Sequence, residues 1–537
     1  MTAPEARTET TPQVDAVTPW SAWPTWLLAA AGGLALYLSH PDAEIRVLAF
    51  VVPALFASAV SRQHAADRSV LPAAAAFGLV AYGLMFRWLI PSAGYAAWIF
   101  LALVHVMWLW GLGWLLARLR RWPAFPLTGA IAWVGIDAWR ATVPLGGFAW
   151  GTLGTSQVGV DWMVPMGRIA GENAMTVFVV LISLGLLLAV EGPVAATRDG
   201  AGRIRLDRVR STLGAGQVGV AWLAGGALVV TLATVEPPPE DGLAQVVLVQ
   251  PWDEEFWQGS DLALDEVVAG NALDLTRAAM DEGPADLVVW PESSIDVDPT
   301  RSPVLAAVVD EAGALTDGHL LAGMNRNGPR PRTFLNTSAV VDDDGQIVAS
   351  YQKRHLVPFG EYVPARSAIG WFPGLEQTPN DGVPGADRQV IEVDGLRVAV
   401  AICFESLFGP LVRENVLAGD EPAQLLVVST NDVSFKRVDQ PAQHRDQSRL
   451  RAIETGRWVV HASVAGGSTV IDPSGGVHEV SDLFHAEYRR VEIPLVTGLT
   501  PFLRTGDWVR PLTMLLSAAA ALALTLMRRR TPPEDQP

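Results

Sequence analysis

Long apolar runs fill the first part of the chain and recur once near its end. Several approach the roughly 20 residues that a helix needs to cross the hydrocarbon core of a membrane, and the first two are shorter. The pattern predicts an integral membrane domain of about eight transmembrane helices, the first two forming a tight pair or lying tilted. The predicted runs are residues 26–38, 47–60, 71–90, 96–116, 125–139, 175–190, 218–235 and 512–527.

Arginine is concentrated in every second loop between these runs. Residues 40–44 and 91–95 contain neither lysine nor arginine, and residues 142–173 contain only Arg168. By the positive-inside rule, this alternation places both termini in the cytoplasm and residues 236–507 on the outer face. The arginines assigned to the cytoplasmic side are Arg62, Arg68, Arg118, Arg120, Arg121, Arg198, Arg203, Arg205, Arg208, Arg210, Arg528, Arg529 and Arg530.

These patterns predict the domain organisation. A disordered cytoplasmic tail, residues 1–23, is polar and lacks the apolar stretch of a cleavable signal. A transmembrane domain of seven helices follows at residues 24–235, and an external domain at residues 236–507. The eighth transmembrane helix, residues 508–528, leads to a cytoplasmic tail at residues 529–537.

Composition narrows the classes of function. Half of the residues are hydrophobic and 20 are tryptophan, which is typical of a membrane protein rather than of one soluble globule. The formal net charge of -17 argues against a nucleic-acid partner, which requires a basic surface. Cys403 is the only cysteine, so it cannot form an internal disulfide and is either inert or used as a thiol. We expect a monomer.

The external region changes pattern, because short apolar segments there alternate with turn residues and helical stretches. This alternation predicts a layered α/β sandwich, in which catalytic groups gather at strand ends. The turn at residues 342–345 predicts a hairpin. The predicted strands are residues 244–250, 286–290, 319–323, 338–342, 396–402, 425–429, 459–464 and 487–493, with helices at residues 260–280 and 303–315.

Three polar residues stand at the ends of such segments. Cys403 ends a buried strand, where a nucleophile would be rigid yet accessible, although a free cysteine is more often core filler. Glu292 is either a general base or a solvated turn carboxylate. Lys353 is either a surface charge or a partly buried ammonium, since a segment with apolar residues, Pro and Gly follows it. His355 is a structural hydrogen-bonding residue rather than a metal ligand, because no second His or Cys lies at ligand spacing.

Glu292, Lys353 and Cys403 together resemble the Glu-Lys-Cys triad of the nitrilase superfamily. More narrowly, the chain is similar to the bacterial apolipoprotein N-acyltransferase family, which joins a multi-helix membrane domain to an external nitrilase-like domain and closes with one helix. The resemblance implies an αββα sandwich for the external domain. It is carried by Trp290-Pro291-Glu292, residues 351–364, Ala401-Ile402-Cys403-Phe404-Glu405, Asn431-Asp432, Gln443-His444, residues 451–457 and residues 471–475.

Two segments depart from the family pattern. Residues 433–436, Val-Ser-Phe-Lys, replace a segment that is usually richer in aromatic residues. Residues 461–466, His-Ala-Ser-Val-Ala-Gly, replace a strand that usually begins with Arg. Both bear on the shape of the acyl or acceptor pocket and leave the triad unchanged.

The three residue types suit nucleophilic acyl transfer. A thiol is activated when a nearby carboxylate removes its proton, which is the role we expect for Glu292 toward Cys403. A fixed ammonium and a backbone N–H stabilise an oxyanion, which we expect of Lys353 and the amide of Phe404. The resemblance implies a supporting acid for Lys353, which we expect to be Glu361 unless it is a surface charge.

Further residues are expected around these groups. Glu405 is expected to orient the loop after the nucleophile. Asp137 and Arg140, near the outer end of their run, are predicted to form an ion pair that snorkels toward lipid headgroups or stabilises the helix end.

Aromatic residues in loops are candidates for lipid or substrate contact. Trp252, Trp257 and Trp371 lie in predicted loops of the external domain, where they either enter the membrane interface or pack locally. Phe148 and Trp150 lie in a loop that resembles the family's external loop near the lipid entrance.

The resemblance implies the reaction. An sn-1 acyl chain passes from a phospholipid to Cys403 as a thioester and then to the α-amino group of a diacylglyceryl-cysteine apolipoprotein, the final step of lipoprotein maturation in the cell membrane. We expect neither a metal nor a dissociable cofactor. The alternative is a membrane-anchored nitrilase-like amidase or hydrolase with water as acceptor. A non-catalytic scaffold would be expected to lack a triad member, and all three are present.

Overall fold

The computed structural model describes most of the chain. Trp257, the arginines of residues 198–210 and most of the predicted run at residues 218–235 lie outside the described residues. The described residues are 23–41, 43–120, 122, 124–196, 225, 235, 238–252, 263–371, 375, 378–435 and 440–530.

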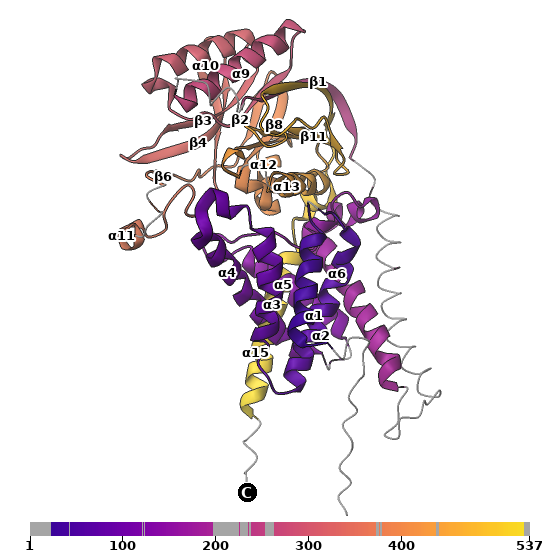
Figure 1. Ribbon diagram of the computed structural model, residues 1–537. Coiled ribbons are helices and arrows are strands. Elements are labelled where there is room, and N and C mark those ends of the chain that lie inside the picture. Colours follow the sequence, from indigo (N-terminus) through magenta and orange to yellow (C-terminus); the bar gives the residue numbers. More distant parts are fainter. Residues whose placement is uncertain are drawn as a thin grey trace, which may run out of the picture.

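Apolar helices form a bundle beneath a domain of two sheets (Figure 1). They occupy the positions of seven of the predicted runs. Within the described residues, four helical segments are long and apolar enough to span a membrane: Arg46–Ala65, Leu89–Leu119, Asp161–Val190 and Val509–Met527. A total of eight crossings stays a prediction. The bundle helices are α1 (Thr25–Leu38), α2 (Val52–Ala65), α3 (Leu71–Met85), α4 (Leu89–Leu119), α5 (Phe125–Arg140), α6 (Val164–Ala196) and α15 (Val509–Arg530).

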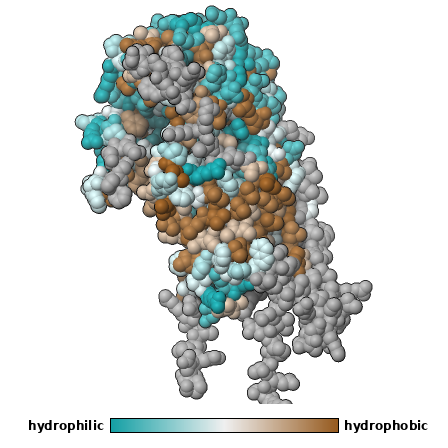
Figure 2. All heavy atoms as spheres, in the orientation of Figure 1, coloured by the Kyte–Doolittle hydropathy of each residue, from teal (hydrophilic) through white to brown (hydrophobic). Residues whose placement is uncertain are grey.

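The last helix, α15, returns to the bundle and packs against α5. Gly135 permits this close approach, because a Cβ there would collide with the Thr513 carbonyl and the Ser517 side chain. Small residues are common where membrane helices pack closely, since they bring the two backbones together. Figure 2 shows a hydrophobic band over the bundle, with hydrophilic surface on the sheet domain above it and at the opposite end below it.

The domain above the bundle, here called the sandwich domain, contains two sheets. The seven-stranded sheet has the order β13-β1-β2-β3-β4-β5, with β6 beside β4, and the six-stranded sheet has the order β12-β11-β10-β9-β8-β7. Strands β1, β2 and β3 are parallel, as are β8, β9 and β10. The strands are β1 (Glu240–Gln250), β2 (Leu287–Ile295), β3 (Leu320–Asn327), β4 (Thr333–Val341), β5 (Ile347–Gln352), β6 (Asp381–Gly382), β7 (Val390–Val393), β8 (Leu396–Ile402), β9 (Leu425–Thr430), β10 (Val459–Ser463), β11 (Thr469–Ile471), β12 (Val477–His478) and β13 (Glu487–Val496).

Helices cover the outer face of each sheet, giving an αββα sandwich. In β8, Val398 and Val400 pack in the core between the sheets, whereas Ala399 and Ala401 pack toward α12. Side chains of a strand alternate between faces, so a strand covered on both sides is apolar throughout. The covering helices are α9 (Leu264–Asp281) and α10 (Pro303–Leu315) on the first sheet, and α12 (Gly409–Val416) and α13 (Gln440–Thr455) on the second.

Helix α13 also joins the sandwich to the bundle. The Glu172 backbone N–H, on α6, donates to Glu454 Oε1 on α13 at 2.9 Å. Helix α6 is interrupted at Gly171, whose φ of 74° breaks the regular backbone pattern next to this contact. The sandwich domain is thereby fixed against the bundle on the side where β8 and β9 end.

Candidate functional site

Cys403 begins the short helix η6 (Cys403–Leu407) at the carboxyl end of β8, and its side chain is partly exposed. Its φ of 51° lies in the left-handed region, which costs a residue with a side chain on the order of 1 kcal/mol. Burial and the charge of Glu292 raise the pKa of the Cys403 thiol well above its usual value, against the opposing effect of the Lys353 ammonium. The resting thiol is therefore protonated at neutral pH and requires a base.

Lys353 is 1% exposed and contacts two carboxylates. Its Nζ donates to Glu292 Oε1 and to Glu361 Oε1, each at 3.0 Å. Burial alone would lower the pKa of Lys353, but the charges of these two carboxylates raise it well above its usual value. Lys353 is therefore an ammonium. Two of its three N–H donors are used by the carboxylates, which leaves one for a substrate oxygen.

Glu292 is buried and accepts several hydrogen bonds. Besides Lys353, Asn336 Nδ2 donates to its Oε1 at 2.7 Å, and the Asn431 backbone N–H donates to its Oε2 at 3.0 Å. Donors on both oxygens hold the carboxylate in one orientation. The structure thus brings Glu292, Lys353 and Cys403 to one place, since the charges of the first two act on the thiol of the third.

Glu361 supports Lys353 rather than standing free on the surface. Its Oε1 accepts from Lys353 and from Asn336 Nδ2, and its Oε2 accepts from the Val357 backbone N–H at 2.7 Å. The carboxylate therefore ties the segment after β5 to the ammonium, which excludes the alternative of a free surface charge.

Glu405 joins the loop of the nucleophile to the segment that carries Lys353. It is fully buried, and its carboxylate accepts from the backbone N–H groups of Ile402 at 2.8 Å and Arg354 at 2.7 Å. The Tyr351 hydroxyl donates to it at 2.9 Å. Burial raises the pKa of Glu405 despite the backbone donors that oppose this. The geometry fits the expected orienting role.

The loop after α5 places aromatic side chains beside the nucleophile. The ring centroids of Phe148 and Phe404 lie 5.8 Å apart, and Phe148 stacks on Trp150 at 5.8 Å. Arg140 Nη1 donates to the Trp150 carbonyl at 2.7 Å and to the Phe148 carbonyl at 3.3 Å, so it holds this loop in place.

Known proteins with similar sequences agree with this architecture. Residues 32–185 match the apolipoprotein N-acyltransferase N-terminal domain, and residues 249–497 match the carbon-nitrogen hydrolase family. An apolipoprotein N-acyltransferase of Gloeobacter violaceus is 30% identical over 540 residues, covering 94% of each chain. The chain belongs to the apolipoprotein N-acyltransferase family. The resemblance predicted from the sequence is thus confirmed.

A second relative is similar over nearly the whole chain. An apolipoprotein N-acyltransferase of Geobacter metallireducens is 27% identical over 540 residues, covering 94% of this chain and 96% of that protein. Among solved structures, a nitrilase-superfamily protein of Saccharomyces cerevisiae matches with 17% identity and a TM-score of 0.35, covering 49% of this chain and 93% of its own.

Two of the expected lipid-facing tryptophans are buried. Trp252 is 7% exposed and packs with Val268, Val464 and Phe484 in a core cluster of the sandwich domain. It therefore packs locally, and its prediction as a lipid contact was wrong. Trp150 is 4% exposed, and its indole N–H donates to Gln443 Oε1 at 2.7 Å. It lies between the bundle and the sandwich and does not face lipid. The sequence did not indicate that Trp150 lies against α13 or that its indole N–H has a polar partner there.

Trp371 remains available for contact. It is 78% exposed, two residues after the end of the short helix α11 (Arg366–Ile369), which projects from the sandwich domain (Figure 1). Trp257 lies outside the described residues. Of the predicted lipid-facing tryptophans that the structure describes, Trp371 is therefore the exposed one.

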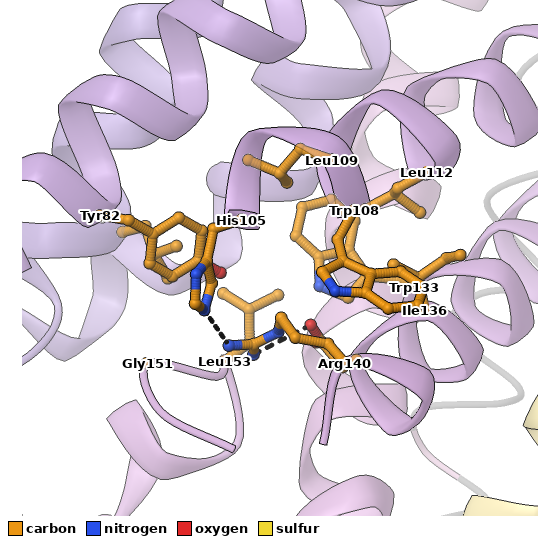
Figure 3. Close-up of a pocket in the computed structure, with 12 residues that line it drawn as sticks. Tyr82, His105, Trp108, Leu109, Leu112, Trp133, Ile136, Arg140, Gly151 and Leu153 are labelled. Carbon is orange, nitrogen blue, oxygen red and sulfur yellow. Dashed lines mark hydrogen bonds and ion pairs between the residues drawn. The ribbon is translucent and has the colours of Figure 1, made fainter. Parts of the chain in front are cut away.

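The predicted ion pair of Asp137 and Arg140 is present, but it does not reach toward headgroups. Arg140 Nη2 donates to Asp137 Oδ1 at 3.2 Å, and Arg140 is 3% exposed. Its Nη1 also lies 3.1 Å from His105 Nε2. These residues border a pocket of about 350 Å3, including its open side, between α3, α4 and α5 (Figure 3). Snorkelling, one of the two expected roles, was wrong, because the loop carbonyls and Asp137 bind the Nη atoms of the guanidinium inside the protein.

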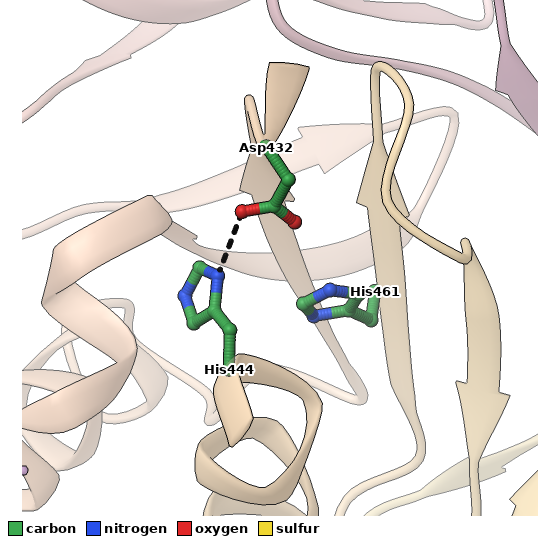
Figure 4. A group of neighbouring side chains, drawn as sticks. All are labelled: Asp432, His444 and His461. Carbon is green, nitrogen blue, oxygen red and sulfur yellow. Dashed lines mark hydrogen bonds and ion pairs between the residues drawn. The ribbon is translucent and has the colours of Figure 1, made fainter. Parts of the chain in front are cut away.

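Several site residues were not predicted from the sequence. Asn336 bridges Glu292 and Glu361, but an Asn on a strand has no signal that distinguishes it from other polar strand residues. Asp432 and His444 occur in the motifs that carry the resemblance, yet no role was assigned to them. Among the described residues, Asp432, His444 and His461 form a buried group whose possible metal-ligand atoms lie within 4.8 Å of one another (Figure 4).

Proposed function

We propose that the chain transfers an acyl chain from a phospholipid to the α-amino group of a diacylglyceryl-cysteine apolipoprotein. The observation that carries this proposal is the position of the sole cysteine, beside a buried Lys353–Glu292 pair and against a loop of an apolar helical bundle. A soluble substrate requires no such bundle, whereas a phospholipid donor and a lipid-anchored acceptor are both delivered from a membrane.

In the first step, Cys403 Sγ attacks the carbonyl carbon of the sn-1 ester while Glu292 accepts the thiol proton. The third N–H of Lys353 and the backbone N–H of Phe404 stabilise the oxyanion that develops. The ester C–O bond then breaks, and Glu292 returns the proton to the departing glycerol oxygen. The products are a lysophospholipid and a thioester on Cys403.

In the second step, the α-amino nitrogen of the apolipoprotein attacks the thioester carbonyl and gives a proton to Glu292. The C–S bond breaks, an amide is formed, and the same proton returns to the Cys403 sulfur. The two bulky lipid substrates use one opening in turn, which predicts ping-pong kinetics. No step requires a metal or a dissociable cofactor.

We also place this reaction at the outer face of the cell membrane. In this arrangement residues 24–235 and 508–528 contribute eight transmembrane helices, and residues 236–507 form the external catalytic domain of a monomer. The tails, residues 1–23 and 529–537, are cytoplasmic. The alternation of arginine-rich loops supports this orientation, and the hydrophobic band over the bundle in Figure 2 supports its place in a membrane. Trp371 would then meet the membrane interface or the acceptor.

The decisive experiment separates the two steps. Incubation of the purified protein with labelled phospholipid and no acceptor should give a hydroxylamine-sensitive acyl adduct at Cys403, located by mass spectrometry. A diacylglyceryl-cysteine peptide added afterwards should remove it. Release of free fatty acid without transfer would favour the hydrolase. Acyl transfer at the parental rate by Cys403→Ala would exclude a thioester intermediate.

A further inference from the structure

Behind the loop of the nucleophile lies a polar group that the reaction steps above do not use. Asp432 follows β9, His444 lies on α13, and His461 lies on β10 (Figure 4). All three side chains are buried. Buried polar groups of this kind are retained where their hydrogen bonds fix a particular arrangement.

His444 connects Asp432 to the nucleophile. Its Nε2 lies 3.1 Å from the Cys403 backbone carbonyl oxygen, and its Nδ1 lies 3.4 Å from Asp432 Oδ1. A carbonyl and a carboxylate only accept hydrogen bonds, so a ring that donates from both nitrogens satisfies both of them. Each nitrogen also lies near a hydroxyl, Nε2 at 3.0 Å from Ser406 Oγ and Nδ1 at 3.3 Å from Thr430 Oγ1, and a hydroxyl can accept from the ring as well as donate to it. The buried Asp432 carboxylate favours the doubly protonated ring. Burial alone would lower the pKa of His444, but the hydrogen bond and charge of Asp432 raise it above its usual value, with a smaller contribution from Glu292.

Asp432 is itself held in place as a carboxylate. The Ser463 hydroxyl donates to its Oδ2 at 3.1 Å. Burial would raise the pKa of Asp432, but its bonds to His444 and Ser463 hold it below its usual value. The buried pair is thus an imidazolium and a carboxylate that neutralise each other.

A metal site is the other use of such a group, but the donor pattern disfavours it. A metal-bound histidine presents an unprotonated nitrogen to the ion. In His444 each nitrogen faces an acceptor, the Cys403 carbonyl or the Asp432 carboxylate, and the raised pKa favours the protonated ring, which offers no free nitrogen to an ion. His461 Nδ1 lies 2.8 Å from the Ser448 hydroxyl oxygen. The centroids of the His461 and His444 rings lie 5.4 Å apart.

The bond to Cys403 acts on the next residue. The Cys403 carbonyl and the Phe404 N–H belong to one planar trans peptide, so they point in opposite directions. Fixing the carbonyl toward His444 therefore aims the Phe404 N–H away from His444. A cationic donor on the carbonyl also polarises the amide and strengthens its N–H as a donor. The bond further restrains Cys403, whose φ is 51°.

We propose that the Asp432–His444 pair is a positioning unit that orients and polarises the Cys403–Phe404 peptide for stabilisation of the oxyanion. This inference rests on the proposed acyl transfer, because it assigns the Phe404 N–H to the oxyanion of that reaction. Neither residue touches the acyl group. Their effect reaches the reacting carbonyl only through the peptide.

The test compares variants that differ only in the donor to the Cys403 carbonyl. Asp432→Asn is combined with His444→Gln or with His444→Ala, so that neither variant leaves an unpaired carboxylate. A Gln amide nitrogen can occupy the position of Nε2, whereas Ala leaves the carbonyl without this donor. Single-turnover thioester formation from labelled phospholipid should be about tenfold slower or more with Ala than with Gln, since a loosened oxyanion donor loses part of its usual effect.

A second readout separates this role from simple support of the fold. Alkylation of Cys403 by iodoacetamide forms no oxyanion, so it reports the access and deprotonation of the thiol without oxyanion stabilisation. Cys403 is the sole cysteine, so the mass shift is unambiguous. The Ala and Gln variants should be alkylated at rates within about threefold of each other, and their half-saturating phospholipid concentrations should agree. Equal loss of alkylation and acylation in the Ala variant would overturn the proposal, as would equal acylation of the two variants.

His461→Gln is the matched control, because it removes a neighbouring buried imidazole that does not contact Cys403. It should form thioester within about threefold of the parental rate. If His461→Gln lost as much thioester formation as the Ala variant, packing of the cluster would be the cause and the proposal would be overturned. The same holds if zinc inhibits thioester formation by the parental protein and His461→Gln abolishes that inhibition.

If the parental protein is alkylated but never forms a thioester, the proposed acyl transfer is contradicted. If the parental protein forms the thioester and the Ala and Gln variants form it at equal rates, only the positioning role of Asp432 and His444 is contradicted.

Discussion

Phe148 and Phe404 link the membrane bundle to the site of the nucleophile, because their ring centroids lie 5.8 Å apart and Phe404 directly follows Cys403. Phe148 also contacts Phe86 at 5.5 Å and His105 at 5.9 Å in the bundle. Aromatic rings thus extend from the bundle to the residue after the thiol. An acyl chain that leaves the bilayer for Cys403 would meet this apolar surface.

Phe148→Ala should weaken the use of the phospholipid donor. Removing the ring takes away apolar contact for the acyl chain, so the phospholipid concentration for half-maximal thioester formation should rise by about tenfold, which corresponds to about 1.4 kcal/mol of binding. The maximal rate should change less, since Glu292 and Lys353 are held by hydrogen bonds to each other, Asn336 and Glu361, all of which the variant keeps. The measurement is the initial rate of thioester formation against phospholipid concentration in mixed micelles.

Tyr95→Ala is the control for this variant. Tyr95 is an exposed aromatic residue near the start of α4, and its ring packs on that of Trp98. Its removal should leave the half-saturating concentration unchanged. An equal rise in both variants would mean that detergent or lipid contact of the bundle, and not the path to Cys403, is responsible.

The strand ends were predictable from sequence because of how covered sheets are built. A strand packed on both sides must be apolar throughout, so β8 is visible as an apolar run that ends just before Cys403. The hairpin of β4 and β5 followed in the same way from its Asp- and Gly-containing turn. Adjacent parallel strands have their carboxyl ends at the same edge of the sheet, so residues far apart in the sequence lie close together there.

Features set by tertiary packing were not predictable. Trp252 follows β1 in a segment with loop composition, yet Val464 and Phe484 cover it from parts of the chain about 200 residues away. The same holds for Trp150, whose indole partner, Gln443, lies on α13. A sequence pattern reports the faces of an element, and it does not report which distant element covers a loop.

Losing either member of the buried ion pair should abolish most thioester formation. Glu292→Gln removes the base, and Lys353→Met removes the ammonium expected to stabilise the oxyanion. Each should lower the single-turnover rate by about a hundredfold or more. Thermal unfolding must be measured alongside, because Lys353→Met leaves Glu292 and Glu361 without their cation. A folded variant with near-parental acylation would show that the triad has been misassigned.

Reporter fusions should reveal opposite sides of the membrane. A reporter fused after Arg210 should report the cytoplasm, and one inserted near Asp381 should report the outer face, since arginine-rich loops are retained inside. Protease accessibility in intact and permeabilised cells gives an independent measurement. Both reporters on one side would contradict the arrangement of eight helices.

Glu454 should make stability depend on pH at the contact between α13 and α6. Burial raises the pKa of Glu454 to about 7, against the opposing charge of Arg451. A carboxyl whose pKa is raised on folding stabilises the protein fully only below its unfolded pKa, about 4.5, and loses this contribution as the pH rises through 7.

Glu454→Gln keeps an oxygen acceptor for the Glu172 N–H without the charge, so it should unfold at a higher temperature than the parent at pH 8. The gain corresponds to about 1–3 kcal/mol and should disappear toward pH 5, where Glu454 is protonated. Asp507, whose pKa burial raises to about 6, remains in both proteins, so its effect cancels in the comparison. A constant difference across this pH range would show that Glu454 is not the group that titrates.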